Sequence, residues 1–472
     1  MSELPRIAVI LAAGQGTRMR SRLAKPLHEV AGRPMLAWVI DAARQAGCSR
    51  ILAVVGHQAE AVQAAFADQD VEWILQEEQL GTGHALAQAE ARLGEGDLDG
   101  REALLMVLNG DVPGLRAETL ERLAAEAEAG WGAMAVADLE TPGSLGRVIA
   151  RPGGGELERI VEARDASAEE LAITCINVGF YAVRAPRVFD DLRRVGTDNA
   201  QGEIYLTDAM GLAATSGDRP VRLVELEDVE EAFGINDRRD LARAHRALID
   251  RHLERLMAEG VTFLDPASTT VEPTVEVGAD SVIHPHVSLL GKTRIGPECE
   301  IHAGCWVRDS QIAARALLRP YSVLEEADVG PRCTVGPFAR LRPGAAMLEK
   351  AHVGNFVEMK KARLGVGAKA GHLTYLGDAE IGAGANIGAG VVTCNYDGQR
   401  KHRTEVGEGA FIGSDTMLVA PVSVGEGATT GAGSVINKDV PAGALGIARE
   451  RQRTIADWAE TQTARRRRDG AS

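Results

Sequence analysis

The sequence predicts two domains of different fold, an α/β domain in the first half and a β-solenoid in the second. The first half alternates short apolar runs with segments of helical spacing, and strands that alternate with helices indicate βαβ units around a sheet. After Val271 an aliphatic residue recurs every six positions instead, and an internal repeat of this length is typical of a solenoid. A chain of 472 residues is long enough for both.

The elements of the first half are predicted from its apolar runs. Residues 7–13 are continuously apolar, which predicts a strand covered on both faces of its sheet. Residues 35–46 have helical spacing and are followed by Gly47, a helix C-cap residue. Residues 237–259, rich in Arg, Glu, Ala and Leu, predict one long connecting helix. Further strands are predicted at residues 51–55, 71–75 and 104–108.

The second half is predicted from its six-residue period. Stacked coils bury each repeated aliphatic on the next, and their thin interior excludes large rings, which agrees with 53 Gly against only 5 Trp, 5 Tyr and 8 Phe. The period breaks between Val392 and Val406, so residues 394–403 are predicted to form a loop expelled from the coil. The inward positions are predicted to be Val277, Ile283, Leu289, Ile295, Ile301, Val307, Val323, Val329, Val335, Leu341, Met347, Val353, Met359, Ile381, Ile387, Val406, Ile412, Leu418 and Val424.

Composition and charge argue against several classes of protein. A net charge of −15 argues against a general binder of nucleic acid or anionic membranes. No apolar run approaches the roughly 20 residues that span a bilayer, and residues 7–13 are better explained as a strand than as a signal peptide. The six cysteines include no Cys-x-x-Cys pair, so we expect reduced thiols and a cytoplasmic location.

The segment that follows the first strand predicts a phosphate-binding loop. Gly14 and Gly16 allow backbone N–H groups to approach a phosphate closely, and Arg18 and Lys25 add positive charge. No Gly-Lys-Ser/Thr follows, and Met19 stands where a dinucleotide fingerprint needs a third glycine. A tight strand-to-helix turn is the structural alternative, and the two cations favour triphosphate binding over it.

Polar residues after later strands predict the rest of this site. Asp111 follows the strand 104–108, where a carboxylate can hold a Mg²⁺ ion that bridges phosphates; a turn aspartate explains it equally well. Asn236 precedes the long helix, so it is either an N-cap or a metal ligand. The Gln76 amide offers both a donor and an acceptor to a uracil edge, or it is a solvated surface side chain.

The solenoid carries a second candidate site. Between residues 337 and 405 ten Lys and Arg outnumber six Asp and Glu, which indicates an anion site suited to a sugar phosphate and coenzyme A, or a solvated charged face. His372 lies in this stretch and could take the proton of an amine that attacks a thioester, although a lone histidine is more often structural. A zinc triad with His352 and His402 is disfavoured because His352 and His372 differ in repeat phase.

These motifs resemble a known family. LAAGQGTRM…KP, QEEQLGTGHA, NGD, Gly146-Arg147, VEARDA, INVG and GIND resemble the sugar-1-phosphate nucleotidyltransferases. With the hexapeptide half, their order resembles the bifunctional N-acetylglucosamine-1-phosphate uridyltransferase/glucosamine-1-phosphate acetyltransferases, from Ile7 to about Arg449. The resemblance implies an α/β nucleotidyltransferase (Rossmann-like) domain at 1–235, a linker helix at 236–265, a left-handed parallel β-helix of hexapeptide repeats at 266–450, and a tail at 451–472.

The resemblance also implies site residues. Mg²⁺ would be held by Asp111 and Asn236, Lys25 would touch the phosphates, and His372 would be the base of acetyl transfer. The UTP nucleotide would be held by Leu11, Ala12, Ala13, Gly14, Gln76, Gly81 and Thr82, and its sugar partner by Gly146, Glu162 and Asn177. Glucosamine-1-phosphate would be held by Arg342, Lys360, Tyr375 and Asn386, and acetyl-coenzyme A by Ala389, Asn395, Tyr396, Ser414, Ala432 and Arg449.

The implied activity is the two-step synthesis of UDP-N-acetylglucosamine: acetylation of glucosamine-1-phosphate in the solenoid, then uridylyl transfer from UTP. Its product would feed bacterial cell-wall and lipopolysaccharide synthesis, and three solenoids would associate into a homotrimer. One alternative is a nucleotidyltransferase whose solenoid only oligomerises or regulates; another is a purely structural solenoid, which leaves the segment from Gly14 to Lys25 unexplained. The tail, with Arg465–Arg468, is expected to be disordered and solvated.

Overall fold

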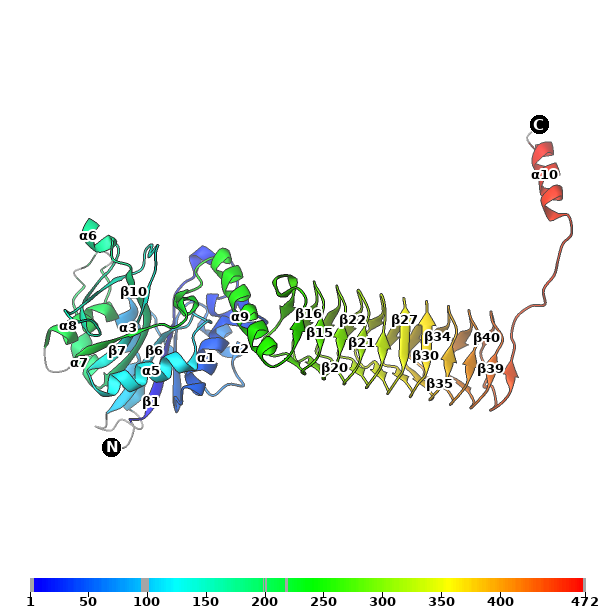
Figure 1. Ribbon diagram of the computed structural model, residues 1–472, viewed down its shortest axis with the longest axis horizontal. Helices are drawn as coiled ribbons and strands as arrows, with labels where there is room; N and C mark the ends of the chain where they lie inside the picture. Colours follow the sequence, from blue (N-terminus) through cyan, green and yellow to red (C-terminus); the bar gives the residue numbers. More distant parts are fainter. Residues whose placement is uncertain (1–3, 95–101, 198, 200–201, 217–219, 470–472) are drawn as a thin grey trace. The chain divides into compact units, whose positions relative to one another are not determined.

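The computed structural model describes residues 4–94, 102–197, 199, 202–216 and 220–469 (Figure 1). The chain divides into two compact units, Met1–Arg251 and His252–Ser472. Helix α9 (Arg238–Ala258) contains the division. No helix among the described residues combines the length and the apolar composition that crossing a membrane would need.

The first unit contains a nine-stranded mixed sheet. Its order is β11-β7-β10-β6-β1-β4-β5, with β8 and β9 attached beside β10. The predicted strands are present as β1, β4, β5 and β6 and pair in parallel, whereas β10 runs antiparallel to both β6 and β7. The strands are β1 (Arg6–Ala12), β4 (Arg50–Val55), β5 (Glu72–Leu75), β6 (Ala103–Asn109), β7 (Gly132–Asp138), β8 (Arg147–Ala150), β9 (Leu157–Val161), β10 (Cys175–Ala185) and β11 (Val221–Glu225); β2 (Glu29–Val30) and β3 (Arg33–Pro34) form a separate ribbon.

Helices cover both faces of this sheet. Ala8 and Ile10 point into a core shared with α1 (Met35–Gln45) and α5 (Ala117–Glu128). Ile7 and Val9, which alternate with them along β1, point into the opposite core. Helices α3 (Thr82–Ala87), α4 (Ala89–Gly94), α7 (Arg187–Leu192) and α8 (Leu206–Ser216) contribute to that second core. The remaining helices of this unit are α2 (Ala59–Ala65), α6 (Ala168–Leu171), η1 (Thr17–Met19), η2 (Lys25–Leu27) and η3 (Val229–Ala232).

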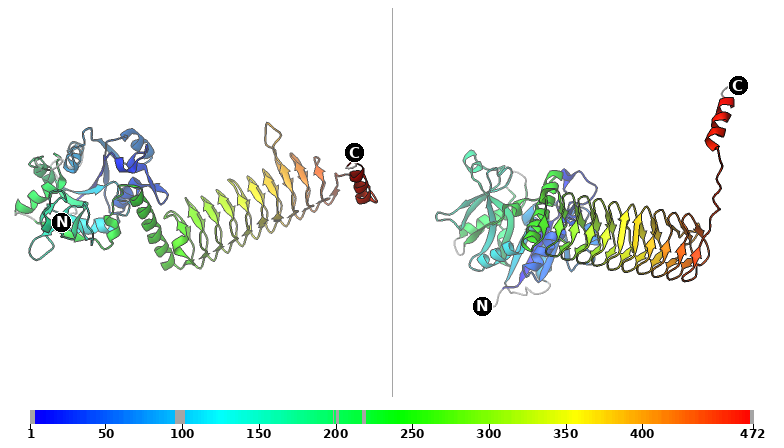
Figure 2. Two further views of the ribbon diagram at one scale, coloured as in Figure 1. Left: turned by 90° about the horizontal axis from the view of Figure 1, so that it is seen from above. Right: turned by 45° about the vertical axis from the view of Figure 1, so that its right-hand side comes forward.

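The second unit is a parallel β-helix of three sheets, as its repeat predicted (Figure 2). The first sheet contains β12 (Thr262–Phe263), β15 (Val282–Ile283), β18 (Glu300–Ile301), β21 (Leu317–Leu318), β24 (Thr334–Val335), β27 (His352–Asn355), β30 (Lys369–His372), β33 (Asn386–Ile387), β36 (Phe411–Ile412), β39 (Thr429–Thr430) and β41 (Leu445–Gly446). A 3-10 turn, η4 (Pro266–Ser268), lies in the first coil.

The other two sheets complete the coils. The second sheet contains β13 (Thr270–Val271), β16 (Ser288–Leu290), β19 (Trp306–Arg308), β22 (Val323–Glu325), β25 (Arg340–Leu341), β28 (Glu358–Lys360), β31 (Tyr375–Gly377), β34 (Val392–Cys394), β37 (Met417–Val419) and β40 (Val435–Ile436). The third contains β14 (Glu276–Val277), β17 (Arg294–Ile295), β20 (Gln311–Ile312), β23 (Asp328–Val329), β26 (Ala346–Met347), β29 (Arg363–Leu364), β32 (Ala379–Ile381), β35 (Thr404–Val406) and β38 (Val422–Val424).

The inward positions confirm the predicted register at every residue except Val323. Val323 is exposed and Leu324 is the buried residue of β22, because the step from Leu324 to Val329 has five residues rather than six. A five-residue step also separates the inward residues Val307 and Ile312, and other consecutive inward residues at the same corner, which lies between the second and third sheets. The loop at 395–403, predicted at 394–403, leaves the coil at that corner as well (Figure 2, left).

Glycines after the inward residues allow the coils to stack closely. A Cβ on Gly382 would lie 2.4 Å from the Glu408 backbone nitrogen, and one on Gly413 would lie 2.5 Å from the Thr430 carbonyl oxygen. Such contacts are shorter than van der Waals packing permits. The aromatic side chains of Tyr321, Phe338 and Phe356 are exposed, as expected for a coil too thin to hold rings.

The tail differs from its prediction. Residues Trp458–Asp469 form helix α10, with no buried residue (Figure 1), so the expectation of disorder is wrong over this segment. Ala459 and Ala464 and the four arginines are good helix formers, which favours local helix without any core to pack against.

Candidate functional site

The loop after β1 is shaped by one glycine. Gly16 has φ +61°, and a Cβ there would lie 2.7 Å from the Lys25 Cβ. Glycine adopts this conformation without strain and leaves that space free. The loop therefore packs directly against η2, which carries Lys25 toward the end of the sheet.

Four predicted polar residues meet beyond the carboxyl ends of β1 and β6. The Lys25 ammonium forms an ion pair with Asp111 and lies 3.5 Å from Asn236 Oδ1. Arg18 Nη2 donates to the same Asn236 oxygen at 2.8 Å. Because β1 and β6 are adjacent parallel strands, their carboxyl ends open at one edge of the sheet. A carboxylate and an amide oxygen beside two cations make a donor set that suits Mg²⁺ with phosphate oxygens.

Asn236 is not the N-cap of the long helix. Helix α9 begins at Arg238, and Asp237 Oδ1 accepts from the backbone N–H groups of Arg239 and Asp240, at 2.7 and 3.1 Å. Hydrogen bonding by Arg239 lowers the pKa of the Asp237 carboxyl to about 2. Since Asp237 caps the helix, the Asn236 side chain is left to face Arg18 and Lys25.

The first cavity, of about 350 Å³, contains the residues predicted to hold a nucleotide. Gln76 lines it and is 4 % exposed, and its Nε2 lies 2.9 Å from His84 Nδ1, which orients the amide. Gly81 has φ +103°, and a Cβ there would lie 2.5 Å from the Ile204 carbonyl oxygen. The lining is Leu11, Ala12, Ala13, Gly14, Lys25, Pro26, Gln76, Gln79, Gly81, Thr82, Ala85, Asn109, Gly110, Asp111 and Glu203.

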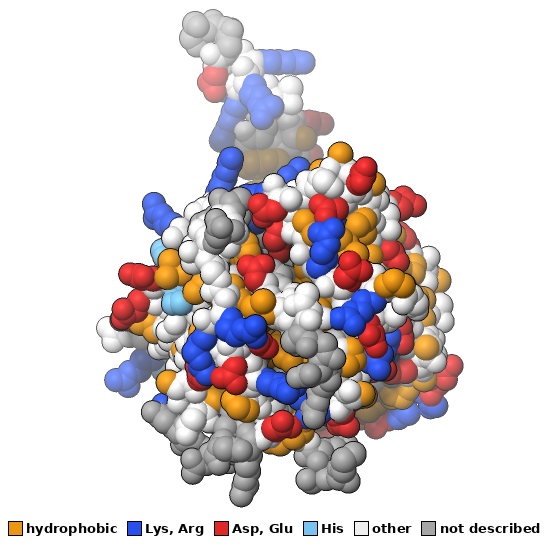
Figure 3. Space-filling model, turned by 90° about the vertical axis from the view of Figure 1, so that its left-hand side faces the viewer, with side chains coloured by type: hydrophobic (Ala, Val, Ile, Leu, Met, Phe, Trp, Pro, Cys, Tyr) orange, Lys and Arg blue, Asp and Glu red, His pale blue; other side chains and the backbone are white. Residues whose placement is uncertain are grey.

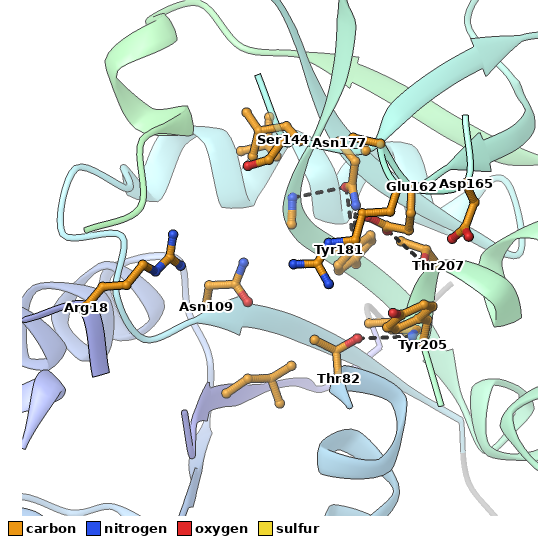
Figure 4. A pocket seen from close by; sticks show the side chains of 18 of the residues that line it. Arg18, Thr82, Asn109, Ser144, Glu162, Asp165, Asn177, Tyr181, Tyr205 and Thr207 are labelled. Carbon is orange, nitrogen blue, oxygen red and sulfur yellow. Dashed lines mark hydrogen bonds between the residues drawn. The ribbon is translucent and has the colours of Figure 1, made fainter. Parts of the chain in front are cut away.

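A second cavity of about 660 Å³ contains the predicted sugar-binding residues (Figure 4). Glu162 accepts from Thr207 Oγ1 at 3.3 Å, and burial raises the pKa of the Glu162 carboxyl. Asn177 Nδ2 donates to the Tyr181 hydroxyl at 2.7 Å. Between Asn177 and Tyr181 the pairing of β10 with β7 is irregular, and such bulges re-aim side chains. Gly146, Glu162 and Asn177 all line this cavity.

The two cavities share three lining residues, Leu11, Thr82 and Asn109, so they form neighbouring parts of one site. Sequence reasoning missed Asn109 as a lining residue, although it directly precedes Gly110. It also missed Gln79, whose Nε2 donates to the Ala13 carbonyl at 2.7 Å, and Tyr181, Tyr205 and Thr207. No spacing signal marks those three: Tyr181 lies on the antiparallel strand β10, and Tyr205 and Thr207 lie at the start of α8, where the Leu206 N–H donates to Thr82 Oγ1 at 3.2 Å.

On the β-helix, four predicted residues form one continuous column. His372 is exposed at the end of β30, two residues beyond the inward Ala370. Ala389, Ser414 and Ala432 hold the same position on the next three coils, since Ala370, Ile387, Ile412 and Thr430 are paired in register. Arg449 lies near the end of this column, because a Cβ built on Gly433, the residue after Ala432, would lie 3.9 Å from Arg449 Cδ. A strip of this kind can accommodate an extended ligand whose reacting end is at His372.

A second column on the neighbouring sheet is basic. Arg342, Lys360 and Gly377 follow the inward residues of three successive coils, and Arg342 Nη1 donates to Glu358 Oε1 at 2.8 Å. The Lys401 ammonium and the Arg342 guanidinium lower the pKa of Lys360. Three cations gathered this closely can attract an anion.

Gly377 continues this column, and two predicted residues occupy the space that its side chain would need. A Cβ there would lie 2.5 Å from the Tyr375 hydroxyl and 2.6 Å from Asn395 Nδ2. Asn395 Nδ2 donates to Asp378 Oδ2 at 2.5 Å. The structure thus brings Tyr375 and Asn395 together beside Lys360.

Two predicted residues are not gathered with these. Asn386 lies on the first sheet, one coil beyond Lys369, whereas Lys360 and Tyr375 lie on the second. Tyr396 is exposed within the expelled loop and donates to the Gly398 carbonyl at 2.6 Å. The nearby cavity of about 450 Å³ is lined by Gly344, Lys361, Ala362, Arg363, Asp378, Ala379, Glu380, Lys401, His402 and Arg403. None of these was assigned to a ligand individually, although the four Lys and Arg residues belong to the basic stretch predicted as an anion site.

An exposed apolar ladder runs beside His372. The rings of Tyr321, Phe338 and Phe356 stack on successive coils with centroids 5.4 Å apart, and Leu373 continues the ladder next to His372. The side chains are 57, 47, 56 and 62 % exposed. Contiguous exposed apolar stripes of this kind are common at protein–protein contacts.

All six cysteines are free, as expected from their spacing. Burial raises the pKa of the Cys305 thiol to about 11, which keeps it protonated and unreactive. On the face of the first unit that Figure 3 shows, Lys and Arg side chains are interspersed with Asp and Glu, and no single charge dominates.

Comparisons with known proteins assign both units. Residues 8–205 match the family of MobA-like NTP transferase domains, and residues 403–438 match the bacterial transferase hexapeptide family (six repeats). These matches and the paired strands confirm the predicted fold class, an α/β transferase domain followed by a left-handed parallel β-helix.

Curated relatives match along nearly the whole chain. The bifunctional protein GlmU of Syntrophotalea carbinolica is 51 % identical over 453 residues, which cover 96 % of each chain. That of an Anaeromyxobacter species is 48 % identical over 475 residues, 100 % of this chain and 96 % of the relative. That of Stutzerimonas stutzeri is 49 % identical over 450 residues, 95 % and 98 % of the two chains. A solved UDP-glucose pyrophosphorylase in complex with UDP-glucose is more distant, with 16 % identity, a TM-score of 0.42, and coverage of 52 % of this chain and 98 % of that one.

Proposed function

The chain belongs to the family of the bifunctional protein GlmU, and on that premise we propose that it makes UDP-N-acetylglucosamine in two steps. The β-helix acetylates glucosamine-1-phosphate with acetyl-coenzyme A, and the α/β unit then transfers a uridylyl group from UTP to the product. The observation that carries the proposal is the meeting of Arg18, Lys25, Asp111 and Asn236 beside two connected cavities, together with the His372 column on a separate unit.

In the uridylyl step, the smaller cavity holds UTP and the larger one holds the sugar phosphate. Gln76 pairs with the uracil edge, while Leu11 to Gly14, Gly81 and Thr82 enclose the nucleoside. Gly146, Glu162 and Asn177 orient the sugar. A phosphate oxygen of N-acetylglucosamine-1-phosphate attacks the α-phosphorus, the bond to the β-phosphate oxygen breaks, and pyrophosphate leaves.

Positioning and charge neutralisation accelerate this step, because phosphoryl transfer needs little covalent help from a protein. Lys25 and Arg18 stabilise the charge that develops on the phosphate oxygens. Asp111 and Asn236 would hold Mg²⁺, and the bound ion would add further neutralisation of the phosphates. The ion pair of Lys25 with Asp111 keeps both side chains directed at this place.

In the acetyl step, the basic column and the His372 column work together. Arg342, Lys360, Tyr375 and Asn386 hold glucosamine-1-phosphate, and the strip of Ala389, Ser414, Ala432 and Arg449 holds acetyl-coenzyme A with Asn395 and Tyr396. The sugar amine attacks the thioester carbonyl, His372 accepts its proton, and coenzyme A leaves as the thiolate. The exposed position of His372 leaves it open to substrate.

We further propose that the active form is a homotrimer whose acetyl sites lie between subunits. Asn386 and Lys360 lie on different sheets and on different coils of the β-helix, so a single chain does not gather them around one small sugar. The exposed ladder of Tyr321, Phe338, Phe356 and Leu373 is an apolar surface for such a contact. Six free thiols suit a reducing compartment, in keeping with a cytoplasmic location.

One pair of assays tests the proposal. Free thiol is followed with acetyl-coenzyme A and glucosamine-1-phosphate, and pyrophosphate with UTP and N-acetylglucosamine-1-phosphate. We expect His372→Ala to abolish thiol release and leave pyrophosphate release unchanged, and Asp111→Ala to do the reverse. If the wild-type protein releases pyrophosphate but no thiol, the solenoid is a non-catalytic oligomerisation or regulatory module, and the first half of the proposal fails.

A further inference from the structure

A group of three side chains on the first coils of the β-helix lies outside both proposed sites. His284 directly follows β15, while Glu300 begins β18 and His302 follows it. The ligand atoms of these three residues all lie within 4.8 Å of one another. Among the described residues, this is the one group of three or more His, Cys, Asp or Glu side chains close enough to hold a metal ion together.

The coil geometry brings the group together. Ile283 and Ile301 pair in parallel, so His284 and His302 occupy the same position on neighbouring coils. Their ring centroids are 4.5 Å apart, close to the roughly 4.8 Å spacing of adjacent strands. Glu300 and His302 flank the inward Ile301 and therefore point out of the same face.

The arrangement already has the dimensions of a metal site. Glu300 Oε1 lies 2.9 Å from His302 Nε2 and 3.3 Å from His284 Nε2. Donor atoms at about 2.0–2.2 Å from a tetrahedral Zn²⁺ are themselves about 3.3–3.6 Å apart, so small rotations would admit the ion. The two imidazoles are 26 and 27 % exposed and the carboxylate is 51 % exposed, so solvent reaches the group.

The neighbouring positions limit the site to these two coils. Leu264 precedes His284 in the column, one coil earlier, and Arg319 follows His302, one coil later. Neither residue is a metal ligand, and the Arg319 cation discourages a second ion. The ligand set is therefore two imidazoles and one carboxylate, which zinc and its chemical neighbours favour over Mg²⁺ or Ca²⁺.

We propose that His284, Glu300 and His302 bind one divalent metal ion of the zinc class, with water completing its coordination. Bound there, the ion ties together two adjacent coils near the start of the β-helix. It stabilises the folded state, because the unfolded chain does not hold the three ligands together. This site is independent of the proposed acetyl and uridylyl transfers.

The test measures Zn²⁺ binding to the full chain after treatment with a chelator, by equilibrium dialysis with metal analysis. We expect the wild-type protein to bind one equivalent that His302→Ala and Glu300→Gln each weaken by about tenfold or more. His286→Asn is the matched control: it removes a nearby histidine outside the group, at a position with φ +59° that Asn tolerates, and it should leave binding unchanged. Zinc that binds at Asp111 and Asn236 would add the same amount in all these variants, so the one equivalent is counted above that common amount.

Cobalt and thermal unfolding supply two further readouts. Co²⁺ should give the visible absorption of a four- or five-coordinate site in the wild type and lose it in Glu300→Gln. Added Zn²⁺ should raise the unfolding temperature of the wild type more than that of either variant. Equal zinc stoichiometry and affinity in the wild type, His302→Ala and Glu300→Gln would overturn the proposal and leave a hydrogen-bonded cluster only.

Discussion

The two proposed sites differ in how much of each a single chain builds. In the α/β unit, residues separated by up to 218 positions meet beside cavities of about 350 and 660 Å³. On the β-helix, His372, Lys360 and Asn386 lie on open columns of an unbranched coil. Loops that converge at one edge of a sheet can enclose a ligand within a single chain. The interior of a thin β-helix is filled by its inward side chains, so its ligands bind on the outer faces. In the proposed homotrimer, a neighbouring copy would cover the second kind of site.

The largest expected effect comes from breaking the proposed contact between copies. Phe356→Asp places a charge in the middle of the apolar ladder, where a buried unpaired carboxylate is strongly unfavourable. We expect the oligomer to dissociate and thiol release to fall by about 100-fold, roughly 3 kcal/mol, while pyrophosphate release is retained. Light scattering and the two assays measure this.

Val366→Asp is the matched control for that variant. Val366 is 47 % exposed but lies at another corner of the coil, so the oligomer and both activities should persist. Two outcomes of Phe356→Asp would contradict the proposal that only the acetyl site needs a second copy. One is an equal loss of both activities, and the other is an unchanged oligomer with full thiol release.

A smaller effect is expected from the backbone of the nucleotide cavity. In Gly81→Ala the new Cβ meets the Ile204 carbonyl at 2.5 Å and the residue keeps φ +103°, a conformation that costs about 1–3 kcal/mol for alanine. We expect a lower unfolding temperature of the α/β unit and a higher KM for UTP, with thiol release unchanged. Gly211→Ala, where nothing lies within 4 Å of the new Cβ, should be neutral or stabilising. A wild-type KM for UTP in Gly81→Ala would show that this loop does not shape the cavity.

The smallest effect concerns stability and pH. Burial raises the pKa of Glu162 above its ordinary 4.5, so the folded carboxyl holds its proton more tightly than the unfolded one. The free energy of unfolding then falls as pH rises from the ordinary to the raised pKa. Glu162→Gln removes this dependence, so at neutral pH we expect a slightly higher unfolding temperature together with a higher KM for the sugar phosphate. Identical pH profiles of stability in the two proteins would show that Glu162 titrates normally.

Much of the fold could be predicted because its signals are local. The apolar run of β1 and the six-residue repeat each lie in continuous sequence, and both predictions are confirmed. The wrong inward assignment of Val323 shows where local sequence stops being sufficient. A five-residue step at one corner shifts the register by one residue, and Leu324, which is the buried residue, is as aliphatic as Val323. The antiparallel β10 was not predicted, since pairing direction depends on distant partners.

The sites divide in the same way. Gly14, Lys25 and Asp111 stand in recognisable local motifs, and the structure brings Lys25 and Asp111 into an ion pair. Tyr181 and Thr207 were missed because nothing near them in sequence marks a cavity. The group of His284, Glu300 and His302 was missed because a spacing of 18 residues becomes a contact only when it equals one turn of the coil.

The two fold classes and the types of chemistry available follow from periodicity and residue type, which act over a few neighbouring positions. Which of those residues meet depends on the arrangement of strands and coils in the folded protein. Asp237 takes the helix cap and leaves Asn236 facing Lys25, and the coil stacks Ala389, Ser414 and Ala432 above His372. Such encounters depend on strand order and coil length, which are set by packing over the whole domain rather than by any local segment.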